Sequence, residues 1–412
     1  MKMKIKKYTG GNSMEHKNTQ KGSFMSIVAI MSIALMAMGF GTITPAMQSI
    51  TEAYPQVPYT TIIYVSTLPT LTLLPASLIT GAVAGKKVKF KTLALLGSAL
   101  FVLSGCAPAV INSNFTYVLI SRAIFGISLG VIAPLGNAII FGLYEGDKRA
   151  SLVGTGTLAM NLGGILLQML GGTLAGIQWN YCFWGHALGI VSFIIILLFL
   201  PEPPKAEESQ EEMKSGKKEK LSGKVWIISL LFALVSLLNY PTMMNMSTIL
   251  VERNIGNAAV AATVLSLFTV GGMIGGAIFG KVFKVTKRYV ISVGCAFFAV
   301  GVALVIIGQN VVVMIAGTTL MGIGFSTIMP SIFMIIGMIV SPSQSAFAIS
   351  LATAIGNFAG FLSTYWILGI KFITGDGIYI PIIIEAIIFV AATIIFLFVN
   401  PIPKPKEVEE VN

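Results

Sequence analysis

The chain has 412 residues, of which 55% are hydrophobic and only 10% are charged, and its net charge is +11. A soluble globular domain carries about 25% charged residues, so this composition excludes a water-soluble protein. The three cysteines, Cys106, Cys182 and Cys295, form no CxxC pair and have no ligand cluster nearby. We therefore expect no disulfide, no metal site and no cofactor.

Twelve apolar tracts follow one another along the chain, each long enough for a membrane-spanning helix of about 20 residues. The tracts are 24–50, 58–84, 92–111, 115–143, 149–177 and 180–200, then 225–250, 257–280, 288–308, 311–338, 345–369 and 378–399. The first is too long for a signal-peptide core of about 7–15 residues and is predicted to be a retained helix. The pattern predicts an all-α integral membrane protein.

The second six tracts repeat the first six. Proline, glycine and asparagine recur 196 residues apart, as in the pairs Pro45 and Pro241, Gly126 and Gly322, Pro134 and Pro330, Asn161 and Asn357, and Gly164 and Gly360. The repeat predicts two pseudo-symmetric six-helix bundles, 24–200 and 225–400, around a central cavity. Secondary transporters bind their substrates between such halves, near the bilayer midplane.

Polar segments separate and flank the two bundles. Residues 1–23 and 401–412 are predicted to be tails, and 201–224 to be the linker between the halves. If all three lie in the cytoplasm, the cytoplasmic segments hold 24 of the 27 basic residues. This bias is the positive-inside pattern, so both termini are expected in the cytoplasm and the chain in the cell (plasma) membrane. Nucleic-acid binding is disfavoured, because the charges are spread over separate short loops.

Two signatures resemble the major facilitator superfamily. Residues 122–130 have the spacing Arg122-xxx-Gly126-xxx-Gly130, as in that family's fourth helix. The run from Gly81 through Gly85, Lys86 and Lys89 resembles its loop between helices 2 and 3, and the run from Gly276 through Gly280 and Lys281 repeats that loop in the second half. With the run NLGGILLQMLGGTLAGIQWNYCFW and the later LPEPP, the chain most resembles the twelve-span drug:proton antiporter branch.

The resemblance implies that these loop residues take part in gating, but the chain departs from the family pattern at two places. The acidic position of the loop is Gly85 in the first half and Gly280 in the second, so a charged latch between the halves is not expected. The antiporters' Gly-Pro pair in helix 5 is replaced by Leu167-Gln168.

Arg122 is the leading candidate for binding substrate or controlling protonation. It lies about eight residues into its tract, roughly 12 Å along a helix. A charge there costs about 2.5–3.5 kcal/mol, so the side chain is expected to face a partner or a wet cavity. Gln48 is predicted as its nearest neutral partner, with Glu52 at the rim. Snorkelling to the membrane surface and a purely structural hydrogen-bonding role remain open.

Further polar and aromatic residues are candidates for lining the cavity, on tracts that face the centre in the resembled fold. They are Gln48, Tyr64, Asn137, Asn161, Gln168, Asn239, Asn245, Asn357 and Tyr365. Asn161 and Asn357 occupy equivalent repeat positions and are expected at the central path or the interface between halves. Glycine runs in tracts 149–177 and 257–280 favour close helix approach, either for rocking of the halves or for ordinary packing.

Ionisable groups for ion coupling are scarce. Among the acidic residues, only Glu385 lies well within an apolar tract. In the resembled fold that helix lies outside the cavity, so Glu385 is expected to be shielded, with a proton-carrying role for Glu385 or Glu52 as the alternative. His186 is expected to be a core histidine, although it could titrate near neutral pH.

The sequence therefore predicts a secondary active transporter that moves a small organic solute by alternating access, with export of drugs or metabolites first. The alternative is uptake or exchange of an organic anion with Arg122 as its counter-ion. A non-transporting membrane sensor is a remote alternative. An enzyme is not expected, because the chain lacks an HExxH motif and has only two histidines for metal or acid–base chemistry. The expected partners are the solute, the lipid bilayer and possible coupling protons; a monomer is expected.

Overall fold

The computed structural model describes residues 24–203, 223–340, 342–375 and 377–400, and these are almost entirely helical. The first half contains α1 (Phe24–Met36), η1 (Gly39–Ala46), α2 (Met47–Ala53), α3 (Tyr59–Ile62), α4 (Tyr64–Val83), α5 (Phe90–Val110), α6 (Phe115–Leu143), α7 (Gly146–Ala175), η2 (Trp179–Ala187) and α8 (Leu188–Phe199). The second half contains α10 (Gly223–Glu252), α11 (Ala258–Thr286), η3 (Lys287–Tyr289), α12 (Val290–Ile307), α13 (Val311–Ile339), α14 (Pro342–Thr374) and α15 (Tyr379–Phe398). The predicted tails 1–23 and 401–412, and most of the linker 201–224, lie outside the described residues.

The twelve predicted spans match this order of elements. Ten stretches in the described residues are long and apolar enough to cross a membrane, and the bent pair Phe24–Met36 and Gly39–Ala53 makes an eleventh. One of these stretches, Ala258–Ile307, covers 50 residues. It contains both α11 and α12, which are separated at η3, where Lys287 has a φ of 45°. Counted separately, these two helices complete twelve spans.

The first span is not the single helix that the sequence predicted. It bends by 40° between α1 and the 3₁₀ segment η1, which contains Pro45. Proline lacks an N–H donor and clashes with the preceding turn, and the glycines at 39 and 41 weaken the helix further. The repeat-equivalent Pro241 lies inside α10, which runs unbroken through it. The two halves therefore use the same proline differently.

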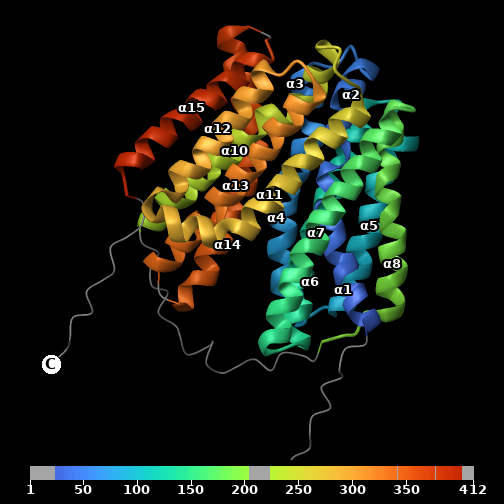
Figure 1. The fold of residues 1–412 in the computed structure, drawn as a ribbon. Coiled ribbons are helices and arrows are strands. Elements are labelled where there is room, and N and C mark those ends of the chain that lie inside the picture. The colour runs from blue at the N-terminus through green and yellow to red at the C-terminus, as the bar shows by residue number, and fades with distance from the viewer. Residues whose placement is uncertain (1–23, 204–222, 341, 376, 401–412) are drawn as a thin grey trace, which may run out of the picture.

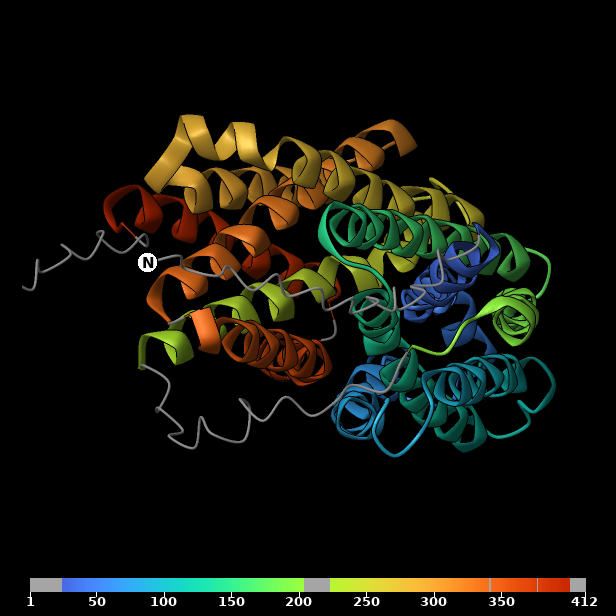
Figure 2. The same cartoon turned by 90° about the horizontal axis from the view of Figure 1, so that it is seen from below.

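The two six-span halves lie side by side in Figure 1, the first in blue to green and the second in yellow to red; Figure 2 shows the same arrangement from below. Equivalent helices pack in the same way in each half, as the glycines show. Gly126 of α6 lies against the backbone of Pro69 in α4, and its repeat partner Gly322 of α13 lies against the backbone of Phe268 in α11. Another pair 196 residues apart, Asn114 and Asn310, caps the N-termini of α6 and α13.

Contacts between the halves concentrate at one end of the molecule. We call the end where α8 stops and α10 begins the linker end, and the opposite one the far end. At the far end Thr67 of α4 is hydrogen-bonded to Thr364 of α14 at 2.9 Å, and Gly172 of α7 lies against Ala258 and Ala262 of α11. Figure 1 shows the halves close together at this end and diverging toward the lower ends of α6 and α14.

The predicted glycine-rich faces of α7 and α11 serve mainly for packing within each half. Gly163 and Gly171 of α7 lie against the backbone of Leu35 and Thr42, and Gly271 of α11 lies against that of Thr319. Gly172 is the glycine of α7 that contacts the other half. The glycine runs therefore mostly set the spacing of helices inside each half.

Candidate functional site

Arg122 is enclosed at the centre of the first half. Its side chain has no exposed surface, its Nε donates to the carbonyl of Val65 at 3.0 Å, and its guanidinium carbon lies 4.1 Å from the centre of the Phe125 ring. Val65 stands four residues before Pro69, which has no N–H to donate to that carbonyl. Arg122 thus binds a carbonyl that the helix itself leaves without a donor.

The remaining guanidinium nitrogens, Nη1 and Nη2, are buried and have no hydrogen-bond partner among the described residues. Gln48, the predicted partner, instead donates to Glu52 at 2.9 Å, so that part of the prediction is wrong. Polar groups buried without a partner are rare and costly, which marks positions where a ligand or a second conformation supplies one. Both Nη groups of Arg122 are therefore unsatisfied in this conformation.

His186 of η2 packs against Phe125, the ring that Arg122 also contacts, and reaches the bend in the first span. Its ring packs edge-on at 4.6 Å from that of Phe125. Its Nδ1 lies 2.9 Å from the carbonyl of Phe183, and its Nε2 lies 3.3 Å from the carbonyl of Gly39 in η1. The side chain is fully buried, as expected of a core histidine.

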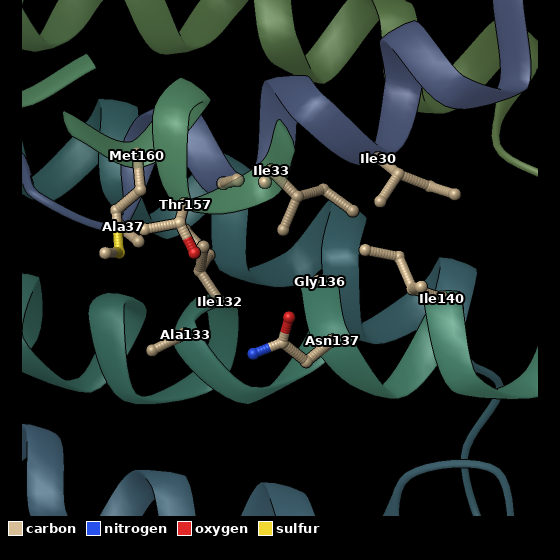
Figure 3. Close-up of a pocket in the computed structure, with 12 residues that line it drawn as sticks. Ile30, Ile33, Ala37, Ile132, Ala133, Gly136, Asn137, Ile140, Thr157 and Met160 are labelled. Atoms are coloured by element: carbon tan, nitrogen blue, oxygen red, sulfur yellow. The ribbon is translucent and has the colours of Figure 1, made fainter. Parts of the chain in front are cut away.

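A cavity of about 90 Å³ lies between α1, α6 and α7 on the linker side of Arg122. In Figure 3 the amide of Asn137 extends from α6 into the space faced by Ile33 of α1 and Thr157 of α7. Asn137 is exposed. Ala133 also lines this cavity and follows Arg122 by eleven residues on α6. Eleven residues are about three helical turns, so the two lie on the same face of α6, roughly 16 Å apart along its axis.

Several predicted residues lie in two of the seams between the halves. In the seam between α7 and α11, Gln168 accepts a hydrogen bond from Ser266 at 3.2 Å. In the seam between α4 and α14, the Tyr64 ring stacks on Phe361 at 6.0 Å and meets Tyr365 edge-on at 6.2 Å. Gln168, Tyr64 and Tyr365 are therefore residues of the interface between the halves in this conformation.

Asn161 and Asn357 are equivalent in the repeat and lie on helices of two different seams. Asn161 lies on α7, which packs against α11, whereas Asn357 lies on α14, which packs against α4. Asn357 is exposed and precedes Phe361 and Tyr365 by one and two turns, so the three share one helix face.

The region around Pro241 on α10 gathers the other predicted polar groups. Asn245 donates to the carbonyl of Pro241 at 2.7 Å and accepts from the Tyr59 hydroxyl of the other half at 2.9 Å. Asn239 is half-buried, and its side-chain oxygen has no partner among the described residues.

Glu385 of α15 braces this same region. Its Oε2 accepts from the hydroxyl of Thr242 at 2.8 Å and from the Thr242 backbone N–H at 3.2 Å. The side chain has no exposed surface, which agrees with the expectation of a shielded residue. Thr242 directly follows Pro241 on α10.

The loop signature behaves differently in the two halves. In the first, α4 ends at Val83 and Gly85 adopts a φ of 72°, a conformation that disfavours any residue with a Cβ. In the second, α11 continues through Gly280 and Lys281 to Thr286. Gly81, Gly276 and Gly280 have open space where a Cβ would be, and Lys86, Lys89 and Lys281 are exposed. The repeated loop predicted in the second half is therefore helical.

A carboxylate that sequence reasoning missed stands at this end of the molecule. Glu202, which follows α8, accepts hydrogen bonds from the backbone N–H groups of Phe90 and Lys91, at 2.7 and 2.9 Å. It thereby caps the N-terminus of α5, where backbone donors lack partners and negative charge is favoured. The feature of the sequence that could have identified Glu202 is its position in the LPEPP run directly after the sixth tract.

Comparison with known proteins identifies the family. The model of the Major Facilitator Superfamily matches residues 29–364 and 228–412. The chain belongs to the Major Facilitator Superfamily. Its helix order and internal repeat agree with this membership. Separately, the described residues contain no group of three or more histidine, cysteine or acidic side chains that could hold a metal ion.

Two curated relatives are drug-resistance proteins. The quinolone resistance protein NorA of Staphylococcus aureus is 28% identical over 157 residues, which are 38% of this chain and 40% of that protein. Multidrug resistance protein 3 of Bacillus subtilis is 29% identical over 137 residues, 33% of this chain and 26% of that protein. The matched segments thus span well under half of either relative.

Solved structures of transporters share the whole fold. A bacterial homologue of the human lysosomal transporter spinster, in an inward-facing and occupied conformation, has a TM-score of 0.70 at 16% identity, covering 92% of this chain and 98% of that one. The nucleoside transporter NupG has a TM-score of 0.72 at 14% identity, covering 91% and 97%. At these identities the likeness shows the fold alone, which is that of a multi-pass membrane transporter.

Proposed function

We propose that the protein is a secondary active exporter of drugs or amphipathic metabolites, working by alternating access with protons as the coupling ion. The observation that carries this proposal is the placement of contacts between the halves at the far end. Thr67 and Thr364 close the seam between α4 and α14 there, while the exposed Asn137 cavity lies toward the linker end. The drug-resistance relatives support the substrate class.

In this proposal the linker end faces the cytoplasm, because it carries the basic loops. The conformation is then inward-facing: a solute enters from the cytoplasm and meets Asn137, Asn161 and the seam residue Gln168. Closure at the linker end and separation of the far-end seams release the solute outside. Monomeric function is part of the same proposal, since each seam lies within one chain.

A second candidate function is transport of an organic anion, and it rests on Arg122. Its guanidinium carries two buried nitrogens without partners among the described residues. Arginine offers planar, paired donors that suit carboxylates and phosphates. If the protein is instead the exporter, Arg122 would exchange its hydrogen bond to the Val65 carbonyl for a different protein group when the far end opens.

A thermal-shift screen distinguishes the two candidates. Purified wild type and Arg122→Ala in detergent are incubated with ethidium, a fluoroquinolone, and aromatic carboxylates. A ligand present at 100 times its Kd stabilises the protein by about 2.7 kcal/mol. Stabilisation of both proteins by ethidium, the organic cation of the panel, supports export of drugs. Stabilisation of wild type alone by carboxylates makes Arg122 a substrate counter-ion and overturns the drug-cation proposal.

Transport itself is tested in cells loaded with ethidium and then energised. The exporter predicts efflux that stops when a protonophore collapses the proton gradient. Efflux equal to that of cells lacking the protein, for every ligand that stabilises it, would contradict the proposal.

A further inference from the structure

One tyrosine of the first half is held by two helices of the second half. Tyr59, the first residue of α3, donates its hydroxyl to Oδ1 of Asn245 on α10 at 2.9 Å. The ammonium nitrogen of Lys371 on α14 lies 4.7 Å from the centre of the same ring. Asn245 has no exposed surface, and Lys371 is 9% exposed. The hydroxyl and the ring of Tyr59 therefore join α3 to α10 and α14, across the interface between the halves.

These contacts lie at the outer edge of the seam between α4 and α14. The two helices run in opposite directions, because α4 begins at the far end and α14 ends there. Tyr59 precedes Thr67 by eight residues, and Lys371 follows Thr364 by seven. The Tyr59 contacts are therefore about two helical turns, roughly 11 Å, beyond the threonine hydrogen bond, and Figure 1 shows α3 at the far end. Separation of the halves at this end breaks both contacts.

The internal repeat does not supply this contact to the other seam. The residues 196 positions away from Tyr59 and Lys371 are Ile255 and Ala175. Neither carries a hydroxyl, an aromatic ring or a charge. The far end of the seam between α7 and α11 is instead packed by Gly172 against α11. The contacts of Tyr59 therefore distinguish the α4–α14 seam from its pseudo-symmetric counterpart.

Both side-chain polar atoms of Asn245 are hydrogen-bonded in this conformation. Its Nδ2 donates to the carbonyl of Pro241 at 2.7 Å, while its Oδ1 accepts from Tyr59. Without the Tyr59 hydroxyl, the buried Oδ1 loses this donor as long as the far end is closed. Once the far end opens, water can supply a donor. The hydroxyl therefore favours the closed conformation over the open one.

We propose that Tyr59 is the outer latch of the far end: its contacts with Asn245 and Lys371 hold the two halves closed there and set how often this end opens. The latch is released when α3 separates from α10 and α14 and water hydrates the three side chains. This inference rests on the proposed alternating access, in which the far end opens to release the solute.

Cysteine labelling measures how often the far end opens and needs no solute. Thr364→Cys, in a background without the three native cysteines, places a thiol at a position with no exposed surface, so a bulky maleimide reacts only after the seam opens. Tyr59→Phe removes the hydroxyl and keeps the ring, and is expected to raise the labelling rate about two- to tenfold. Tyr59→Leu removes the ring as well and is expected to raise it by about a further two- to fivefold.

Two controls separate a latch from a general loss of stability. Tyr54→Phe removes another tyrosine hydroxyl at the same end, which donates to the carbonyl of Asn112 within the first half at 2.5 Å. Its labelling rate should stay within about twofold of the unsubstituted background. In an Asn245→Ala background the acceptor is gone, so Tyr59→Phe should change the rate by less than about twofold. Thermal unfolding shows that each variant is folded at the labelling temperature.

The latch and the proposed export function fail separately. An unchanged labelling rate in Tyr59→Phe, an equal rise in Tyr54→Phe, or the same rise with and without Asn245 would overturn the latch, even if the protein exports its solute. The expected labelling rates in a protein that moves no solute would support the latch and leave the export function contradicted.

Discussion

Arg122 and Glu385 are ionisable side chains enclosed in membrane-spanning segments, and each is bound at a helix whose bonding a proline disturbs. Arg122 binds the carbonyl that Pro69 leaves without a donor, and Glu385 binds the N–H and hydroxyl of Thr242 beside Pro241. Sequence reasoning identified both side chains, because charge inside an apolar tract is conspicuous. It missed their partners because these are mainly backbone groups, although Pro69 was a visible signal for one of them.

The brace at Glu385 is expected to contribute to stability. Thr242→Val preserves side-chain shape but removes the hydroxyl donor, leaving a buried carboxyl with fewer hydrogen bonds. We expect a loss of about 1–3 kcal/mol in the free energy of unfolding, measured as a lower melting temperature in detergent. Ser247→Ala is the control on the same helix, since the Ser247 hydroxyl is buried without a partner among the described residues. An equal effect of both substitutions would contradict the brace.

Glu385→Gln separates a brace from a proton carrier. The amide oxygen still accepts from Thr242, so the fold and proton-coupled transport are expected to persist within about twofold of wild type, a change worth under 0.5 kcal/mol. Substrate-driven proton movement in proteoliposomes, followed with a trapped pH-sensitive dye, measures the coupling. Transport that continues without proton movement in this variant would make Glu385 the coupling site.

Helices in this protein approach one another through glycines, and the repeat conserves the contact in both halves. Gly126 and Gly322 each lie where a Cβ would be closer than 3.0 Å to the backbone of the neighbouring helix. The sequence predicted the positions of nearly all helices, because the apolar tracts are long and clearly bounded. It did not predict η1, since the repeat-equivalent Pro241 is accommodated without a break. The difference was visible in the sequence, because Gly39 and Gly41 stand where the second half has Val235 and Leu237.

Substituting these glycines tests the helix contacts. Gly126→Ala and Gly322→Ala are each expected to destabilise the protein by about 1–3 kcal/mol, because the helices cannot approach as closely. Gly136→Ala on α6, with no atom within 4 Å of the new Cβ, should be neutral or stabilising by up to about 1 kcal/mol. Thermal unfolding in one detergent compares the three; destabilisation by Gly136→Ala as large as the others would contradict the packing argument.

At the scale of the whole molecule, the repeat fixed the division into halves, but it could not say which ends of the helices meet. That depends on the conformation, and here the far-end seams are closed by Thr67 with Thr364 and by Gln168 with Ser266. The repeat predicted that Asn161 and Asn357 lie at the central path or the interface between the halves. The two-fold arrangement places their helices, α7 and α14, in different seams.

Alternating access requires the far-end seam to open during transport, and a cross-link between Thr67→Cys and Thr364→Cys tests this requirement. The two hydroxyl oxygens are 2.9 Å apart, so the introduced thiols should oxidise to a disulfide in a background without Cys106, Cys182 and Cys295. We predict that oxidation abolishes export of the solute identified by thermal shift and that reduction restores it, while each single cysteine variant transports under both conditions. Export at the wild-type rate by the fully cross-linked protein would contradict alternating access through this seam.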